Sequence, residues 1–101
     1  NVDPMEVEGY LSSHPDIAEV AVVGMADARL TEVAVAFVIP RSGSGITAAE
    51  IIESCKGKIA SFKIPKHVLL VDELPMTSSG KVQKVKLREQ VAALAAASIG
   101  D

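Results

Sequence analysis

Apolar residues recur along this chain at two different spacings, which distinguish its expected helices from its expected strands. The run Asp3-Pro4-Met5-Glu6 is typical of a helix start, because a carboxylate can cap the first turn and proline fits its first position. Val7 and Leu11 follow at helical spacing, and Pro15 ends the segment. The pattern predicts a first helix that ends at His14, which we interpret as a capping or surface residue rather than an acid or base.

Two segments rich in β-branched residues predict two strands. Residues 17–24 are apolar apart from Glu19, which is typical of a buried strand. Along residues 32–40, successive side chains point to opposite faces of the expected strand, which places the alanines and Val38 on one face. The other face carries the larger side chains, which are Val33, Val35, Phe37 and Ile39. The connection between the two strands is short, so the strands are expected to pair antiparallel.

A second helix is predicted after the flexible connector at residues 42–45. Thr47-Ala48-Ala49-Glu50 has the form of a capping box. The helix carries an apolar stripe of Ile51, Ile52, Cys55 and Ile59, which we expect to pack on Phe37 and Leu70. Cys55 is therefore interpreted as a small buried hydrophobic residue rather than a nucleophile. No spacing of histidine or carboxylate nearby suggests a metal site.

The last part of the chain predicts a third strand, a polar loop and a final helix. Residues 68–71 are apolar, and Pro75 ends the strand. The final helix is marked by Leu87, Val91 and Leu94 at helical spacing. The order of elements predicts an α+β fold, a small two-layer domain with a mixed or antiparallel three-stranded sheet packed with helices.

Composition narrows the class of protein. With 101 residues, of which 49% are hydrophobic and 23% charged, the chain is expected to form one globular domain. Aromatic residues make up 3% and tryptophan is absent, so the core must be built from aliphatic side chains. A single cysteine cannot form an internal disulfide, and no long apolar run predicts a transmembrane segment or a secretion signal. These features predict a reducing, cytoplasmic setting.

Charge is distributed unevenly along the chain. Residues 1–55 contain nine acidic and two basic residues, whereas residues 56–101 contain eight basic and four acidic residues. The basic half could bind a nucleotide, a coenzyme or an acidic partner surface, or could simply be a solvated lysine-rich face. It includes the polar loop before the final helix, where Thr77, Ser79 and Gly80 precede Lys81. A lysine on such a turn is well placed to reach a phosphate, although serine and glycine are also ordinary turn residues.

Several motifs together resemble a known family. They are Asn1-Val2-Asp3-Pro4-Met5-Glu6-Val7-Glu8, Phe62-Lys63-Ile64-Pro65-Lys66, Val71-Asp72-Glu73-Leu74-Pro75-Met76-Thr77, Ser79-Gly80-Lys81 and Lys86-Leu87-Arg88-Glu89. Over essentially its whole length the chain resembles the C-terminal domain of AMP-forming acyl-CoA synthetases, in the adenylate-forming superfamily that includes luciferases and peptide-synthetase adenylation domains. It departs from the usual family pattern at Asp3, Ala26 and Thr31, which usually read tyrosine, proline and glycine. The loop is more similar to the medium- and long-chain fatty acyl branch than to peptide synthetases.

This resemblance implies a function and a site. Residues 1–101 would form the mobile C-terminal lid domain of a fatty acid–CoA ligase, whose larger N-terminal domain, absent from this chain, holds ATP with Mg²⁺ and the fatty acid. Lys81 would be the catalytic lysine of the adenylation step, supported by Thr77, Ser79 and Gly80. The domain would then rotate for thioester formation with coenzyme A. Lys63 and Lys84 are candidate nucleotide, coenzyme A or interdomain contacts.

The same resemblance implies what the fragment lacks. The chain alone is expected to be inactive and to bind no cofactor by itself. Lys81 is also a candidate target of a protein lysine acetyltransferase, since acetylation would remove its charge. No metal site is expected within the chain.

Two functions of other classes stay open on the residues alone. One is a stand-alone module that binds nucleic acid through Gly80, Lys81 and the cations Lys84, Lys86 and Arg88. The scarcity of aromatic residues and the net charge of −3 argue against it. The other is an interaction domain that docks on a partner protein.

Overall fold

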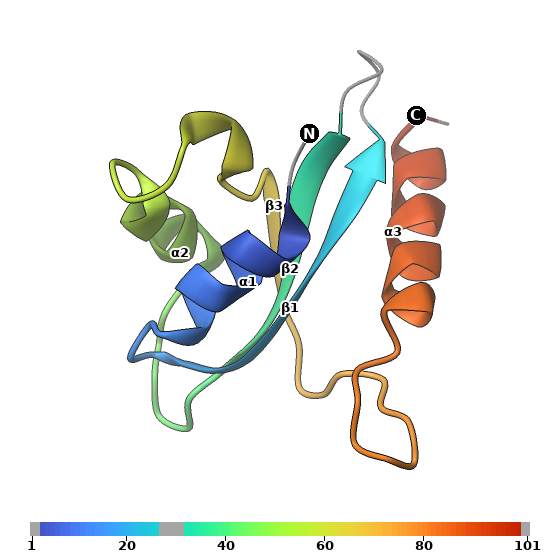
Figure 1. The fold of residues 1–101 in the computed structure, drawn as a ribbon, viewed down its shortest axis with the longest axis horizontal. Coiled ribbons are helices and arrows are strands. Elements are labelled where there is room, and N and C mark those ends of the chain that lie inside the picture. Colours follow the sequence, from blue (N-terminus) through green and yellow to red (C-terminus); the bar gives the residue numbers. More distant parts are fainter. Residues whose placement is uncertain (1–2, 27–31, 100–101) are drawn as a thin grey trace.

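The computed structural model describes residues 3–26 and 32–99, with side chains as far as Ala93. Asn1, Val2, Thr31 and the side chain of Leu94, all named above, lie outside the described part. The elements are α1 (Pro4–Ser12), β1 (Ile17–Ala26), β2 (Glu32–Pro40), α2 (Ala48–Cys55), the 3₁₀ helix η1 (Ser61–Lys63), β3 (His67–Leu70) and α3 (Lys84–Ile99) (Figure 1). No helix in these ranges is long and apolar enough to cross a membrane.

The three strands form one mixed sheet in the order β1-β2-β3. β1 and β2 are antiparallel, with Val22 opposite Ala36, as their short connection predicts. β3 pairs with β2 in parallel, with Val68 opposite Ala36. Parallel pairing is possible because α2 and η1 carry the chain back across the sheet before β3 begins. The predicted α+β fold with a small three-stranded sheet is therefore confirmed, and the sheet is the mixed one of the two predicted forms.

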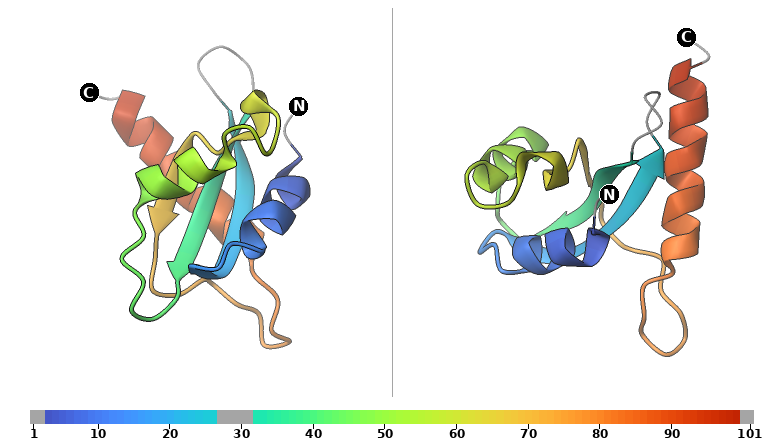
Figure 2. Two further views of the ribbon diagram at one scale, coloured as in Figure 1. Left: turned by 90° about the vertical axis from the view of Figure 1, so that its left-hand side faces the viewer. Right: turned by 45° about the horizontal axis from the view of Figure 1, so that its top comes forward.

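Helices cover both faces of this sheet. α1 and α2 lie on one face and α3 lies on the other (Figures 1 and 2). The alternation along β2 explains the arrangement, because Ala34, Ala36 and Val38 join the core with α1 and α2. Val35 and Phe37 join the second core with Leu87 and Val91 of α3. The sheet is therefore sandwiched between helices, which refines the predicted two-layer arrangement. Both faces of the sheet are apolar, and each needs helices to shield it from water.

One predicted contact is wrong. Phe37 packs in the core under α3, while Ile51 and Cys55 of α2 pack in the core on the opposite face. Leu70, the other expected partner of α2, is 44% exposed. Ile51, Ile52 and Cys55 of the predicted stripe lie on α2, whereas Ile59 lies beyond the end of the helix and packs against the same core. Residues of β2 one position apart face opposite sides of the sheet. α2 therefore packs on β3 and shares one core with Val68 and with the alanine face of β2.

The predicted helix starts are confirmed at both capped helices. The side chain of Asp3 accepts hydrogen bonds from the backbone N–H groups of Met5 and Glu6. At α2 the hydroxyl of Thr47 accepts from the Glu50 N–H at 3.1 Å, and the Glu50 carboxylate accepts from the Thr47 N–H at 2.9 Å. Such caps satisfy N–H groups that have no partner within the helix. They fix where α1 and α2 begin.

His14 and Cys55 have the structural roles that the sequence predicts. His14 lies just beyond α1, where its backbone N–H donates to the carbonyl oxygen of Leu11 at 3.0 Å and its Nδ1 accepts a hydrogen bond from the Asp16 N–H at 3.0 Å. Cys55 is fully buried, and its thiol donates to the carbonyl oxygen of Ile51 at 3.4 Å. Burial raises the pKa of the Cys55 thiol because the thiolate would lose its hydration.

The raised pKa of Cys55 predicts a loss of stability at alkaline pH. A group with a raised pKa in the folded state contributes stability below its unfolded pKa, about 8.5 for a thiol, and loses it as the pH rises through the folded value. We expect the difference in unfolding free energy between wild type and Cys55→Ala to shrink between pH 7 and pH 10. Urea unfolding of both proteins at pH 7 and at pH 10 measures this difference. A difference that does not change with pH would contradict the desolvation of the thiol.

Candidate functional site

The polar loop between β3 and α3 is a closed hairpin. Leu74 anchors its start in the core beneath α3, where it is 7% exposed. Met76 and Val82 then form an antiparallel bridge, and the Gln83 N–H donates to the carbonyl oxygen of Pro75 at 2.8 Å. Two backbone contacts thus close the neck of the loop. Beyond it, the tip projects past the end of the sheet (Figures 1 and 2).

Thr77 organises the tip of this hairpin. Its N–H donates to the Lys81 carbonyl oxygen at 2.7 Å, and its hydroxyl accepts from the Lys81 N–H at 3.1 Å. Its carbonyl oxygen accepts from the Gly80 N–H at 3.0 Å, and its hydroxyl lies 3.0 Å from that of Ser79. The structure therefore brings the four predicted loop residues into one turn. Both backbone groups of Lys81 are held by Thr77.

Gly80 occupies the left-handed position of the turn, with φ +87°. A turn of this kind places its last residue in a backbone conformation that residues with a Cβ atom rarely adopt. A Cβ added at Gly80 would meet no atom within 4 Å, so any cost of a substitution arises from the backbone conformation alone. The glycine is therefore required by the turn rather than by close packing.

Replacing Gly80 by alanine is expected to destabilise the turn by about 1 kcal/mol, since the left-handed conformation costs an L-residue roughly 1 to 2 kcal/mol. Chemical denaturation of the complete chain measures the change. Gly45→Ala is the matched control, because Gly45 also has open space around it and does not have a positive φ. Equal effects of the two substitutions would contradict the assignment of strain to Gly80.

Lys81 presents its side chain to solvent at this tip. The residue is exposed, and within residues 3–26 and 32–99 its ammonium group takes part in no ion pair. An ammonium group on a flexible stem, carried by a rigid turn, can contact an anion on another molecule or domain. Short hydroxyl side chains on the same turn leave the approach open.

The two other predicted cations do not gather around Lys81. Lys63 lies on η1, which is at the opposite end of the sheet from the loop (Figure 1). Its ammonium group is 2.7 Å from a carboxylate oxygen of Glu6 and 5.7 Å from the ring centre of Phe62. Lys84 begins α3 and is 2.8 Å from a carboxylate oxygen of Glu8. Each is thus paired with a carboxylate on α1.

The carboxylates of Glu6 and Glu8 were missed as functional candidates. The opposite charges of the two halves of the sequence were the available signal, but they did not indicate which residues meet. Lys63 is 57 residues away from its partner along the chain. The basic half of the sequence therefore does not act as one free cationic face, since part of it neutralises the acidic first helix.

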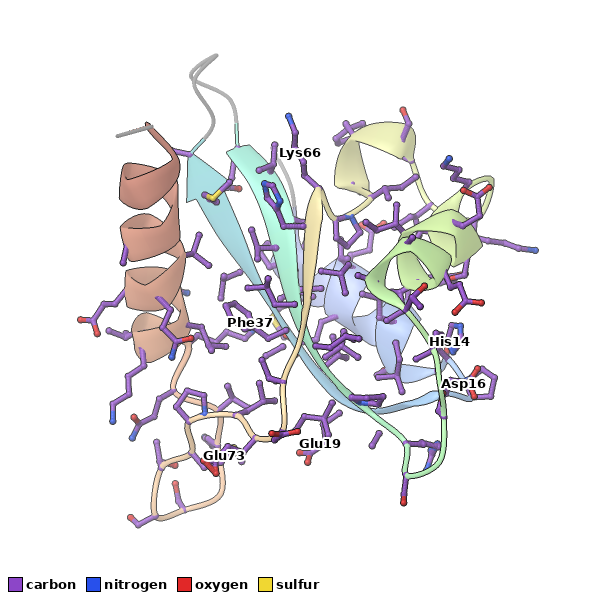
Figure 3. The ribbon with its side chains drawn as sticks, turned by 180° about the vertical axis from the view of Figure 1, so that it is seen from behind. His14, Asp16, Glu19, Phe37, Lys66 and Glu73 are labelled. Atoms are coloured by element: carbon purple, nitrogen blue, oxygen red, sulfur yellow. The ribbon has the colours of Figure 1, made fainter. Side chains whose placement is uncertain are left out.

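A polar hollow of about 540 Å³ lies elsewhere on the surface, lined by His14, Asp16, Glu50 and residues 43–46. Figure 3 shows His14 and Asp16 near α2, on the side of the molecule away from α3. Within the described part of the chain, no group of three or more histidine, cysteine or acidic side chains could hold a metal ion. The hairpin that carries Lys81 is therefore the candidate functional site.

Comparison with known proteins identifies the family of this chain. The indoleacetate–CoA ligase of Aromatoleum aromaticum is 48% identical over 92 residues, which are 91% of this chain and 18% of that protein. The mitochondrial medium-chain acyl-CoA ligase of Homo sapiens is 46% identical over 91 residues, 90% of this chain and 15% of that protein. The crystal structure of ATP-bound MatB from Rhodopseudomonas palustris superimposes with a TM-score of 0.83 at 39% identity, covering 89% of this chain and 18% of that one.

The chain therefore spans less than a fifth of the length of these relatives. The family model for the AMP-binding enzyme C-terminal domain matches residues 6–81, from α1 to the lysine of the hairpin. This match takes in most of the chain and agrees with the relatives in sequence and in fold. The chain belongs to the AMP-binding enzyme C-terminal domain family.

Proposed function

We propose that residues 1–101 are the C-terminal lid domain of an AMP-forming acyl-CoA ligase, and that Lys81 is its adenylation lysine. The exposed ammonium group on the Gly80 turn, within a chain of this family, is the observation that supports the proposal. The larger N-terminal domain would be the partner of this one. It would hold ATP and the acid, since the relatives are more than five times longer than the matched segment.

In the first step, a carboxylate oxygen of the acid attacks the α-phosphorus of ATP. The bond from that phosphorus to the bridging oxygen of pyrophosphate breaks, which yields acyl-AMP and pyrophosphate. Negative charge spreads over the phosphate oxygens in the transition state. The ammonium group of Lys81, delivered into a cleft between the domains, stabilises that charge more strongly than it stabilises the ground state.

In the second step, the sulfur of coenzyme A attacks the acyl carbonyl carbon. The thiol proton passes to solvent, the carbon–oxygen bond to AMP breaks, and the products are acyl-CoA and AMP. This step needs no cation at the α-phosphate to activate an attack there. We propose that the domain rotates between the steps, withdrawing Lys81 and presenting a different face to the cleft.

The acyl substrate that we propose is a medium- or long-chain fatty acid. Its support is the similarity of the loop to that branch and the name of the human relative, although the Aromatoleum relative is named for indoleacetate. ATP would enter with Mg²⁺, but the described residues of this domain offer no cluster of ligands for that ion, and no step is assigned to it. A cytoplasmic location is proposed from the lone buried thiol, which suits a reducing compartment.

The proposal is tested on the full-length protein that contains this chain. With ATP, coenzyme A and a panel of fatty acids, we expect equimolar AMP, pyrophosphate and acyl-CoA, and no product without the acid. Formation of ADP and phosphate would overturn the assignment. Activity confined to aromatic or dicarboxylic acids would overturn the fatty acid alone and leave the AMP-forming ligase in place.

The stand-alone nucleic-acid or interaction module finds no support in the described residues. Lys63 and Lys84 are neutralised by carboxylates on α1. The relatives compared above are CoA ligases or adenylate-forming enzymes. We therefore propose no second function.

A further inference from the structure

Glu8 lies where three elements of the fold meet. One of its carboxylate oxygens, Oε2, accepts a hydrogen bond from the Val22 N–H of β1 at 2.9 Å. The same oxygen is 2.8 Å from the ammonium group of Lys84, at the start of α3. The side chains of Glu8 and Lys84 are 28% and 26% exposed. One half-buried carboxylate on α1 is therefore in contact with both β1 and α3.

The topology explains why a single side chain can do this. β1 is an edge strand, so the backbone N–H groups on its free side have no partner in the sheet. α1 covers one face beside this strand and α3 covers the other (Figure 2). Glu8 reaches the free edge of β1 from α1, and there it meets Lys84 from the opposite face.

This contact differs from an ordinary surface ion pair. Exposed ion pairs contribute little to folding stability, because water screens the charges and the paired side chains lose conformational freedom. Glu53 and Lys56, one turn apart on and after α2, are such a pair, with side chains 71% and 61% exposed. At Glu8 the backbone N–H of Val22 holds the carboxylate in place, and partial burial reduces screening. The ion pair to Lys84 is consequently geometrically fixed.

Lys84 also stands at the base of the hairpin. It follows Gln83, whose N–H closes the neck of the loop on Pro75. Lys81 lies three residues before Lys84, and its backbone is held within the turn by Thr77. A continuous series of contacts therefore connects α1 through Glu8 and Lys84 to the turn that carries Lys81. Movement of α3 against α1 would shift the direction in which Lys81 projects.

We propose that Glu8 is a positioning residue for Lys81, acting through its ion pair with Lys84 at the free edge of β1. The role rests on the proposed function, because it concerns the reach of the Lys81 ammonium group to the α-phosphate. Glu8 contacts no reacting atom. Its effect is to fix the base of the hairpin to α1, so that the ammonium group enters the cleft in one orientation.

The test substitution is Glu8→Gln in the full-length ligase. The glutamine oxygen can still accept from the Val22 N–H, whereas the charge that attracts Lys84 is lost. We expect adenylation, measured as pyrophosphate release in a single turnover, to slow about tenfold, since misplacement of a reacting group is costly. Thioester formation from preformed acyl-adenylate and coenzyme A should change less than twofold. Glu53→Gln is the matched control, because it removes one carboxylate from the exposed pair, and it should leave both rates unchanged.

A double-mutant cycle separates positioning from a general effect on folding. Lys84→Met breaks the same ion pair while leaving the Glu8 to Val22 hydrogen bond intact, and it should slow adenylation to a similar extent. The combined variant should be no slower than either single one. Equal slowing of both half-reactions, or losses that multiply in the combined variant, would overturn the positioning role. Should Glu8→Gln fail to fold, Lys84→Met alone carries the comparison of the two half-reactions.

The outcome for Lys81 distinguishes this proposal from the one on which it rests. A Lys81→Ala ligase with unchanged adenylation overturns the proposed chemistry, and the positioning role falls with it. A slow Lys81→Ala ligase together with a normal Glu8→Gln ligase overturns the positioning role alone. If both variants are slow and only in adenylation, the result supports the proposed role of Lys81 and the positioning role of Glu8.

Discussion

Replacing Lys81 by alanine in the proposed full-length ligase is expected to slow acyl-adenylate formation by about 10²-fold or more. This loss corresponds to roughly 3 kcal/mol, comparable with removal of one strong donor to a developing oxyanion. The side chain is exposed at a hairpin tip and is held by no ion pair within the described residues, so the substitution should not disturb the fold. Single-turnover release of pyrophosphate measures the step.

Thioester formation provides the contrast within the same protein. Starting from preformed acyl-adenylate and coenzyme A, Lys81→Ala should change the rate far less, because we propose that the domain has by then turned the lysine away. Lys58→Ala is a suitable control, since Lys58 is an exposed lysine in the turn after α2. Equal slowing of both half-reactions would show that Lys81 is not specific to one step. Unchanged adenylation would remove its chemical role altogether.

Acetylation of Lys81 should reproduce the loss reversibly. Acetylation removes the positive charge but keeps the stem, so adenylation should fall as it does in Lys81→Ala. We propose this exposed lysine as a substrate for a protein lysine acetyltransferase. Ligase acetylated in vitro and then treated with a deacetylase should lose and regain adenylation. Full activity of a stoichiometrically acetylated Lys81 would contradict the proposal.

Ile51→Ala is expected to destabilise the domain by about 2 to 5 kcal/mol, a large part of the stability of a small protein. The Ile51 side chain is fully buried in the core between α2 and the alanine face of the sheet. Truncation removes apolar contact and leaves a cavity that the surrounding aliphatic core can only partly fill. Urea unfolding of the complete chain, analysed as a two-state transition, measures the change.

The neighbouring isoleucine is the control for this prediction. Ile52 is only partly buried at the margin of the same core, so Ile52→Ala should cost less than half as much as Ile51→Ala. Lys81→Ala should leave the unfolding free energy almost unchanged. A larger loss for Ile52→Ala than for Ile51→Ala would mean that α2 is rotated relative to the sheet.

Local rules identified most of the elements and the candidate site from the sequence. The cap at Asp3, the capping box at Thr47 and the alternation along β2 depend on neighbours a few residues apart. The turn that carries Lys81 is equally local, because its hydrogen bonds connect residues only two to four positions apart. Such interactions can be identified without knowledge of the rest of the chain. The role of Lys81 came from family resemblance and stays a proposal.

Tertiary structure decided which face meets which helix and which charges meet. The pattern of β2 showed two apolar faces, but it could not show that α1 and α2 lie on the side of the alanines and that α3 lies on the side of Phe37. Likewise, the sequence displayed an acidic half and a basic half without pairing Glu8 with Lys84, or Glu6 with Lys63. These choices depend on the path of the chain around the sheet, which returns β3 parallel to β2 and brings α1 and α3 to the same edge of β1. Contacts between distant residues form because packing of the whole core selects one such path, and no short stretch of sequence contains that information.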